Sequence, residues 1–87
     1  MRGSLVIARD YKGVALVRRV WEASSKVVYL SEERQFQQLS TGMDALRPVG
    51  FPAADVFAYD PTAAEAIKNG SVDWSTLELF TALSRQD

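Results

Sequence analysis

Residues 14–31 read VALVRRVWEASSKVVYLS, and this stretch decides the fold. Its first part, Val14 to Ala23, is rich in β-branched and other apolar side chains, which favours a β-strand. A second apolar segment, Lys26–Ser31, follows across Ser24-Ser25, so the stretch predicts a β-hairpin. The second strand is apolar on both faces, which is typical of a central or covered strand.

Arg18 and Arg19 are adjacent within the first of these strands. Successive side chains of a regular strand point to opposite faces, so one arginine would face the core. A β-bulge or a strong bend removes that conflict. We expect the bend, because a small barrel needs one.

Further short elements are expected on both sides of the hairpin. A strand over Ser4 to Arg9 precedes it and ends in the turn residues of 10–13, DYKG. After it, Ser31 is expected to cap a short helix over Glu32–Thr41 that stops at Gly42. Residues 43–52 hold two prolines and a glycine and predict an ordered loop, and Val56 to Tyr59 predicts a last strand.

Two helices are expected after these strands. Asp60-Pro61 places a capping carboxylate before a proline at the first helical position, which predicts a helix over Thr62–Lys68 that ends at Asn69-Gly70. Asp73 is suited to cap a second helix from Trp74 to about Leu83, in which apolar residues recur every three positions. We expect this apolar stripe to dock on the sheet, and a helix-in-groove contact or a dimer surface is the alternative.

Length and pattern together predict a single α+β domain over residues 1–87. A chain of 87 residues is long enough for one domain and too short for two. The expected architecture is a small antiparallel β-barrel or strongly bent sheet over residues 4–60, with an inserted short helix. The two C-terminal helices would occupy residues 61–85.

Composition argues against most enzyme chemistry. The chain has no cysteine and no histidine, which removes disulfides, thiolate metal sites and the commonest general base. Its five glycines are scattered and form no phosphate-binding loop. Ser24-Ser25-Lys26 places a lysine beside serines, but in the expected hairpin turn. We therefore predict that the protein is not an enzyme and uses no cofactor and no metal.

Hydropathy bears on location. The longest uninterrupted apolar runs are four residues, whereas a membrane span needs about 20 and the apolar region of a signal peptide about 7–15. We expect no membrane association and a cytoplasmic location.

Charge is unevenly distributed along the chain. The net charge is −1, but residues 1–30 carry six basic and two acidic residues, and residues 31–87 carry four basic and nine acidic residues. A basic half can steer an anionic partner to one side of the molecule. Alternatively, the two halves fold so that their charges intermix.

Basic and aromatic residues occur together in the first two strands and the turn between them. They are Arg9, Tyr11, Lys12, Arg18, Arg19 and Trp21. Small barrels that bind single-stranded nucleic acid use such a mixture, with bases stacked on rings beside a groove that neutralises phosphates. The alternative for Trp21 is a place in the hydrophobic core.

Two short segments resemble the ends of a Src-homology-three domain: ARDY at residues 8–11 and GFPAADV at residues 50–56. In that family an Ala-Leu-Tyr-Asp-Tyr segment opens a small barrel. A Gly-aromatic-Pro segment, one helical turn and a valine-bearing strand close it. The resemblance covers residues 4–60 and implies a Src-homology-three-like barrel.

The same resemblance carries over only Tyr11 and Pro52 as residues of the family's peptide groove. Asp55 stands where the family has a groove tyrosine, and Trp21 comes too early to be the groove tryptophan. Recognition of proline-rich peptides is therefore not implied.

The leading functional hypothesis is a non-catalytic module that binds another protein. The expected contact residues are Tyr11, Arg18, Arg19 and Trp21 on the barrel, with Asp55 at its rim. One alternative is a nucleic-acid-binding barrel that uses the same basic strands. Another is a structural or self-assembly role, including a homodimer, through the C-terminal helices.

Overall fold

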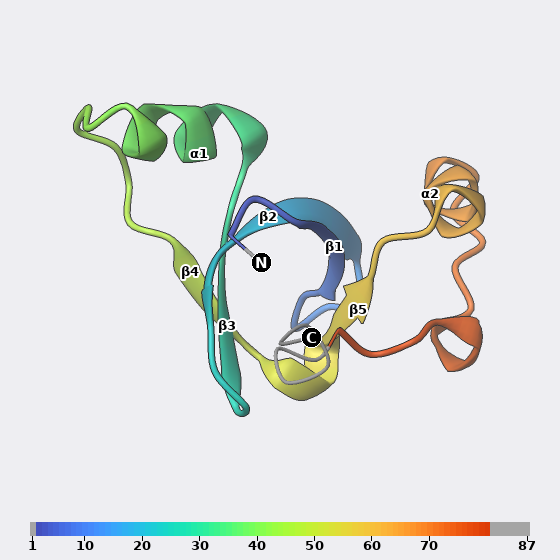
Figure 1. The fold of residues 1–87 in the computed structure, drawn as a ribbon. Coiled ribbons are helices and arrows are strands. Elements are labelled where there is room, and N and C mark those ends of the chain that lie inside the picture. Colours follow the sequence, from blue (N-terminus) through green and yellow to red (C-terminus); the bar gives the residue numbers. More distant parts are fainter. Residues whose placement is uncertain (1, 81–87) are drawn as a thin grey trace.

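The computed structural model describes residues 2–80 and has an α+β fold, with one five-stranded antiparallel sheet and two α-helices (Figure 1). The strands are β1 (Leu5–Arg9), β2 (Ala15–Ala23), β3 (Val27–Ser31), β4 (Val49–Pro52) and β5 (Val56–Ala58), in the sheet order β4-β3-β2-β1-β5. The helices are α1 (Glu33–Ser40) and α2 (Pro61–Lys68), and the single 3-10 turns are η1 (Ala53–Asp55) and η2 (Trp74–Thr76).

The predicted hairpin is confirmed, because β2 and β3 pair antiparallel. Its register shifts between Val20 and Glu22, so Trp21 is the extra residue of a β-bulge. β2 curls through this region in Figure 1. Arg18 pairs with Val6 and so shares the inner face of the sheet, whereas Arg19 pairs with Leu5 on the outer face. The bulge follows both arginines, so they still point to opposite faces of the sheet, and both remain part-exposed.

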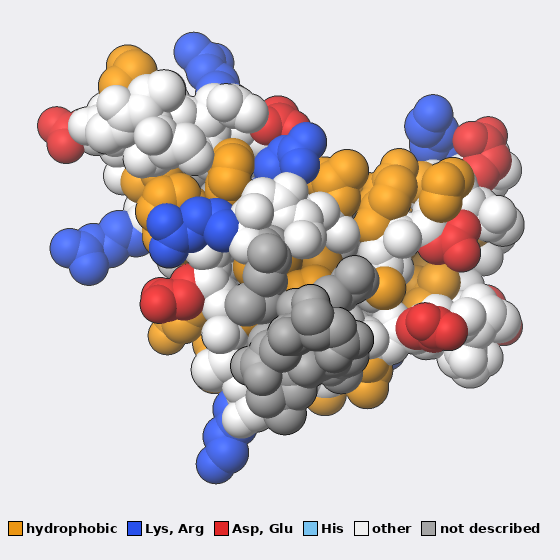
Figure 2. Space-filling view, viewed as in Figure 1, with side chains coloured by type: hydrophobic (Ala, Val, Ile, Leu, Met, Phe, Trp, Pro, Cys, Tyr) orange, Lys and Arg blue, Asp and Glu red, His pale blue; other side chains and the backbone are white. Residues whose placement is uncertain are grey.

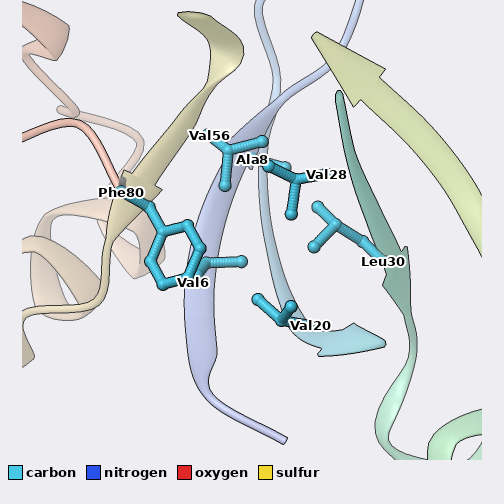
Figure 3. Close-up of a cluster of buried hydrophobic side chains, with 7 residues drawn as sticks. All are labelled: Val6, Ala8, Val20, Val28, Leu30, Val56 and Phe80. Carbon is cyan, nitrogen blue, oxygen red and sulfur yellow. The ribbon is translucent and has the colours of Figure 1, made fainter. Parts of the chain in front are cut away.

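The sheet packs apolar side chains on both faces. The inner cluster gathers side chains from β1, β2, β3 and β5 around one aromatic ring (Figure 3); its buried members are Val6, Ala8, Val20, Val28, Leu30, Val56 and Phe80. On the outer face, Ile7 and Phe57 are buried beneath α2 and η2, with Ala63 from α2. Trp74 and Leu77 also pack against this outer cluster.

The sheet is curled but not closed. β4 and β5 stand at the two ends of the strand order, and no pairing joins them within residues 2–80. The expected strongly bent sheet is therefore present, without the strand pairing that would complete a barrel.

The second predicted C-terminal helix, Trp74 to Leu83, is wrong over its described part. Asp73 does act as a cap, since its carboxylate accepts from the Ser75 N–H at 3.1 Å, but the turn lasts only three residues. The chain then runs beside β5: Ala58 N–H donates to the Glu78 carbonyl at 2.8 Å and Phe80 N–H to the Val56 carbonyl at 3.0 Å. Residues 81–83 lie outside the described residues.

A physical reason accounts for this difference. The edge of β5 carries backbone groups that need partners, and the segment of residues 78–80 supplies them. The extended path also carries Phe80 into the inner cluster, where the ring is 3% exposed. Trp74 and Leu77 pack against the outer cluster. The apolar residues that recur every three positions are thus divided between the two faces of the sheet.

The predicted caps of α2 are confirmed, whereas the predicted N-cap of α1 is wrong. Asp60 accepts from the Thr62 N–H at 2.7 Å, and α2 is followed by Gly70 at φ +67°, as expected. Ser31, by contrast, is the last residue of β3 and is buried, and Glu32 is the N-cap of α1. The predicted loop over residues 43–52 also ends in a strand, because residues 49–52 form β4.

No helix within residues 2–80 has the length and apolar character that crossing a membrane would require.

Candidate functional site

Tyr11 lies at the tip of the turn between β1 and β2, and its side chain is 92% exposed. The turn is held by the Asp10 carboxylate, which accepts from the N–H groups of Lys12 and Val14, both at 2.8 Å. Gly13 follows with φ +80°, a conformation that glycine adopts at little cost. The ring is thus displayed on an ordered turn, with the Lys12 ammonium 5.5 Å from its centre.

Asp55 has a structural partner that the sequence did not reveal. One of its carboxylate oxygens accepts from two N–H groups of Arg9, at 2.9 and 3.1 Å. The Arg9 guanidinium also lies 5.2 Å from the ring centres of Phe57 and Trp74. This pair ties β1 to η1 at the end of the sheet near the Tyr11 turn.

Arg18 and Arg19 both face carboxylates at the start of α1. Arg19 donates to Glu33 at 2.6 Å and to the Gly3 carbonyl at 2.6 Å. Arg18 lies 3.7 Å from the Glu32 carboxylate. Hydrogen bonds from Gln37 and then from Arg19 lower the pKa of Glu33 below its usual value.

Trp21 joins α1 to the sheet and belongs to neither buried cluster. Its ring meets Phe36 of α1 edge-on, with 5.7 Å between ring centres. The Arg2 guanidinium lies over the same ring at 4.2 Å. The indole is part-exposed, so the alternative of a buried core position for Trp21 is wrong.

The five predicted contact residues therefore fall into two groups. Tyr11 and Asp55 lie near the end of β1, whereas Arg18, Arg19 and Trp21 lie beside α1. The structure does not bring them together into one site.

A shallow cleft lies next to Trp21 on the outer face of β2 and β3. It has a volume of about 320 Å³ and is lined by Trp21, Glu22, Tyr29, Arg47 and Pro48. The β-bulge contributes, because it places Glu22 opposite Tyr29 directly after Trp21. The chain returning from α1 supplies the remaining wall.

Tyr29 stands in this cleft against a glycine of the neighbouring strand. It pairs with Gly50 of β4, and a Cβ atom at Gly50 would lie 3.1 Å from the tyrosine ring. Glycine thus leaves room for the ring, which is 42% exposed.

The segment that joins α1 to β4 exposes large aliphatic side chains. Met43 and Leu46 are 60% and 82% exposed, and Val49, the first residue of β4, is 59% exposed. The segment is tied down, because the Gln35 side-chain amide donates to the Leu46 carbonyl and the Met43 N–H to the Gln38 carbonyl. From the sequence alone, these residues are assigned to an ordered loop and are not proposed as contact residues. Their signal is three large apolar residues, three positions apart, in a proline- and glycine-containing stretch without a helix pattern.

The chemistry of this region is that of contact. The cleft offers two aromatic rings, one carboxylate and one guanidinium, which suit stacking, hydrogen bonding and ion pairing. Within residues 2–80, no group of three or more acidic side chains is arranged to hold a metal ion.

Comparisons of the chain with protein-family models, with curated proteins and with solved structures found no significant match. The resemblance to Src-homology-three domains remains a prediction from the sequence.

Proposed function

We propose that this protein is a non-catalytic interaction module that binds another protein through the surface around the cleft. This cleft surface consists of Trp21, Tyr29, Arg47 and Pro48, together with Met43 and Leu46 of the segment that leads into it. The observation that carries the proposal is the aromatic cleft, in which Tyr29 is 42% exposed, together with the exposed Met43 and Leu46 of the tied-down segment that leads into it. Single exposed apolar residues are normal, but grouped ones with a polar rim mark contact sites.

The residue types of the cleft surface fit this role. Tryptophan, tyrosine, methionine and arginine are enriched in protein–protein interfaces, and the first two often supply most of the binding energy together with arginine. Trp21 is fixed in place by Phe36, so it loses little side-chain freedom when a partner binds.

Ion pairing favours a protein partner over nucleic acid. Arg9, Arg18 and Arg19, which the nucleic-acid alternative needs, lie 2.9, 3.7 and 2.6 Å from carboxylates of this same chain. A phosphate would have to displace those carboxylates before it gained the contacts that dominate nucleic-acid binding.

The self-assembly alternative requires the apolar stripe of the C-terminal segment to be exposed. Trp74 and Leu77 of the C-terminal stripe pack on the outer cluster of the sheet, so they are engaged within the chain.

The other predicted contact residues differ in how available they are to a partner. Tyr11 is free to form a second contact from its exposed turn. Contacts through Arg18, Arg19 or Asp55 remain predictions, and each would require the side chain to leave its ion pair.

We also propose that the curled sheet is an open form of a Src-homology-three-like barrel, in which β4 and β5 are not paired within residues 2–80. In support, the GFP segment at residues 50–52 lies in β4, the single turn η1 follows, and Val56 begins β5, which pairs with β1. This is the closing arrangement that the resemblance implies.

Affinity capture with matched variants tests the binding proposal. Leu46→Ser removes a side chain that is 82% exposed, so folding should be unchanged. We expect Leu46→Ser to lower partner recovery at least ~5-fold, the loss that corresponds to about 1 kcal/mol. Val14→Ser is the control, because Val14 is also exposed but lies in the β1–β2 turn. Equal recovery by both variants, or recovery of nucleic acid in place of protein, would overturn the proposal.

A further inference from the structure

The free edge of β4 has one backbone position turned toward solvent with both a donor and an acceptor. The Ala53 N–H donates to the Lys26 carbonyl at 2.9 Å. This bond shows which opposite pairs of β3 and β4 are hydrogen-bonded and which are not. Hydrogen-bonded pairs alternate in an antiparallel ladder, so Val28 and Phe51 exchange bonds. Gly50 is the next position, and its N–H and C=O therefore point away from β3.

Proline limits what this edge is able to bind. Pro48 and Pro52 occupy the outward-pointing positions on either side of Gly50, and proline has no N–H to donate. Such prolines protect an edge from pairing over a long stretch with a second copy of the chain. What remains is a short site whose register is set by Gly50.

A partner residue paired with Gly50 would project its side chain onto the outer face, because paired residues point to the same side of a sheet. Gly50 has no side chain to block it there. The partner's side chain would therefore contact the part-exposed ring of Tyr29 and the cleft beside Trp21. This space suits a large apolar or aromatic side chain. The partner's neighbouring residues would point to the inner face, where Val49 is 59% exposed.

Two cations flank this edge. Arg47 immediately precedes Pro48 and lines the cleft, and Lys26 lies beside the Val27–Pro52 pair at the other end of β4. Neither is in an ion pair within the described part of the chain. Glu22 is the one carboxylate that lines the cleft.

The opposite side of the molecule is acidic. In Figure 2, several acidic side chains and one basic side chain lie on the right, over α2 and the segment after it, whereas the left and lower parts carry most of the Lys and Arg side chains together with a few acidic ones. The sequence agrees, since residues 60–78 carry four acidic residues and one lysine. Such an asymmetry orients an acidic partner toward the β4 edge.

We propose that the β4 edge binds a short, extended, acidic segment of another protein, which pairs with Gly50 and places a large apolar side chain against Tyr29. Acidic residues on either side of that apolar residue would meet Arg47 and Lys26. The inference rests on the proposed function and specifies the partner's chemistry; it uses the strand-addition mode of peptide recognition.

Amide NMR of the full chain, titrated with a defined peptide, tests this inference. The probe is an acetylated, amidated Glu-Val-Phe-Val-Glu peptide. We expect the Gly50 amide to shift and its hydrogen exchange to slow at least ~5-fold, as a new hydrogen bond requires. The same peptide with an N-methylated phenylalanine cannot donate to the Gly50 carbonyl, and we expect it to bind at least ~5-fold more weakly.

Charge reversal supplies the matched variants. Lys-Val-Phe-Val-Lys should bind more weakly than the acidic peptide, and Arg47→Glu should reduce that preference. Lys68→Glu, on α2, makes the same charge change away from β4 and should leave the preference unchanged. Equal binding of both peptides, shifts centred on the Tyr11 turn, or no shift at the highest soluble peptide concentration would each overturn the inference.

The two proposals fail in different ways. If a captured protein partner depends on Leu46 but leaves the Gly50 amide unprotected in the complex, the strand-addition inference is wrong and the binding function stands. If capture is independent of Leu46, the proposed function itself is wrong.

Discussion

Phe80 shows how much one residue contributes to this small sheet. It comes from the segment after η2, and its ring fills the inner cluster between side chains of β1 and β5 (Figure 3). Leu79, its neighbour, forms an isolated antiparallel β-bridge with Phe57, and Leu79 is 52% exposed. The same backbone path therefore carries one buried and one exposed apolar side chain.

We predict that Phe80→Ala destabilises the protein by about 3–5 kcal/mol, because it removes a buried ring and leaves a cavity. That is a large part of the ~5–15 kcal/mol that holds a typical domain together. Urea unfolding followed by tryptophan fluorescence measures the change. Leu79→Ala is the control and should cost far less; equal costs for the two variants would contradict the assigned role of Phe80.

At the scale of elements, α1 depends on a few contacts at its first turn. None of its residues is buried, and it reaches the sheet through Phe36 and through the pairing of its carboxylates with Arg18 and Arg19. The folded state holds the pKa of Glu33 below its usual value. The ionised form of Glu33 is therefore favoured by folding.

A carboxyl whose pKa is lowered by folding stabilises the protein above its usual pKa of about 4.5, and loses that contribution as the pH falls through the folded-state value. We predict that Glu33→Gln lowers the free energy of unfolding at about pH 7, and that its difference from wild type shrinks toward about pH 3. Urea titrations at both pH values measure it. Glu65→Gln, at an exposed position of α2, is the control, and a difference for Glu33→Gln that did not change with pH would contradict the prediction.

Elements set by adjacent residues could be predicted from the sequence. Asp60-Pro61 and Gly70 bound α2, and the hairpin around Ser24-Ser25 forms, because caps and turns depend on residues a few positions apart. The path after Asp73 could not be predicted, since it is decided by the open edge of β5, some twenty residues earlier in the chain. A distant partner overrode a local helical pattern.

The candidate site was only partly predictable for the same reason. Trp21 stood out as an aromatic residue, and it does line the cleft. Arg18 and Arg19 stood out as cations, but whether they are available depends on Glu32 and Glu33, which belong to the start of another element. The exposure of Leu46 depends on where α1 returns the chain, which no local pattern records.

At the scale of the whole molecule, the segment after Tyr59 is packed into the sheet rather than attached beside it. Its residues cover Ile7 and Phe57 on the outer face and place Phe80 in the inner cluster. Both faces of β1 and β5 are therefore completed by residues that follow Tyr59. A small domain has little apolar burial to spare.

We predict that a chain ending at Tyr59 has no cooperative unfolding transition, because it lacks the cover of the outer face as well as Phe80. Circular dichroism during urea unfolding measures this, with the full chain as reference. Adding a peptide of residues 60–87 in excess should restore a sigmoidal transition whose midpoint rises with peptide concentration, since a ligand of the folded state stabilises it. If the shortened chain unfolded at the same urea concentration as the full one, the strands would be a self-sufficient sheet and the C-terminal segment a mere attachment.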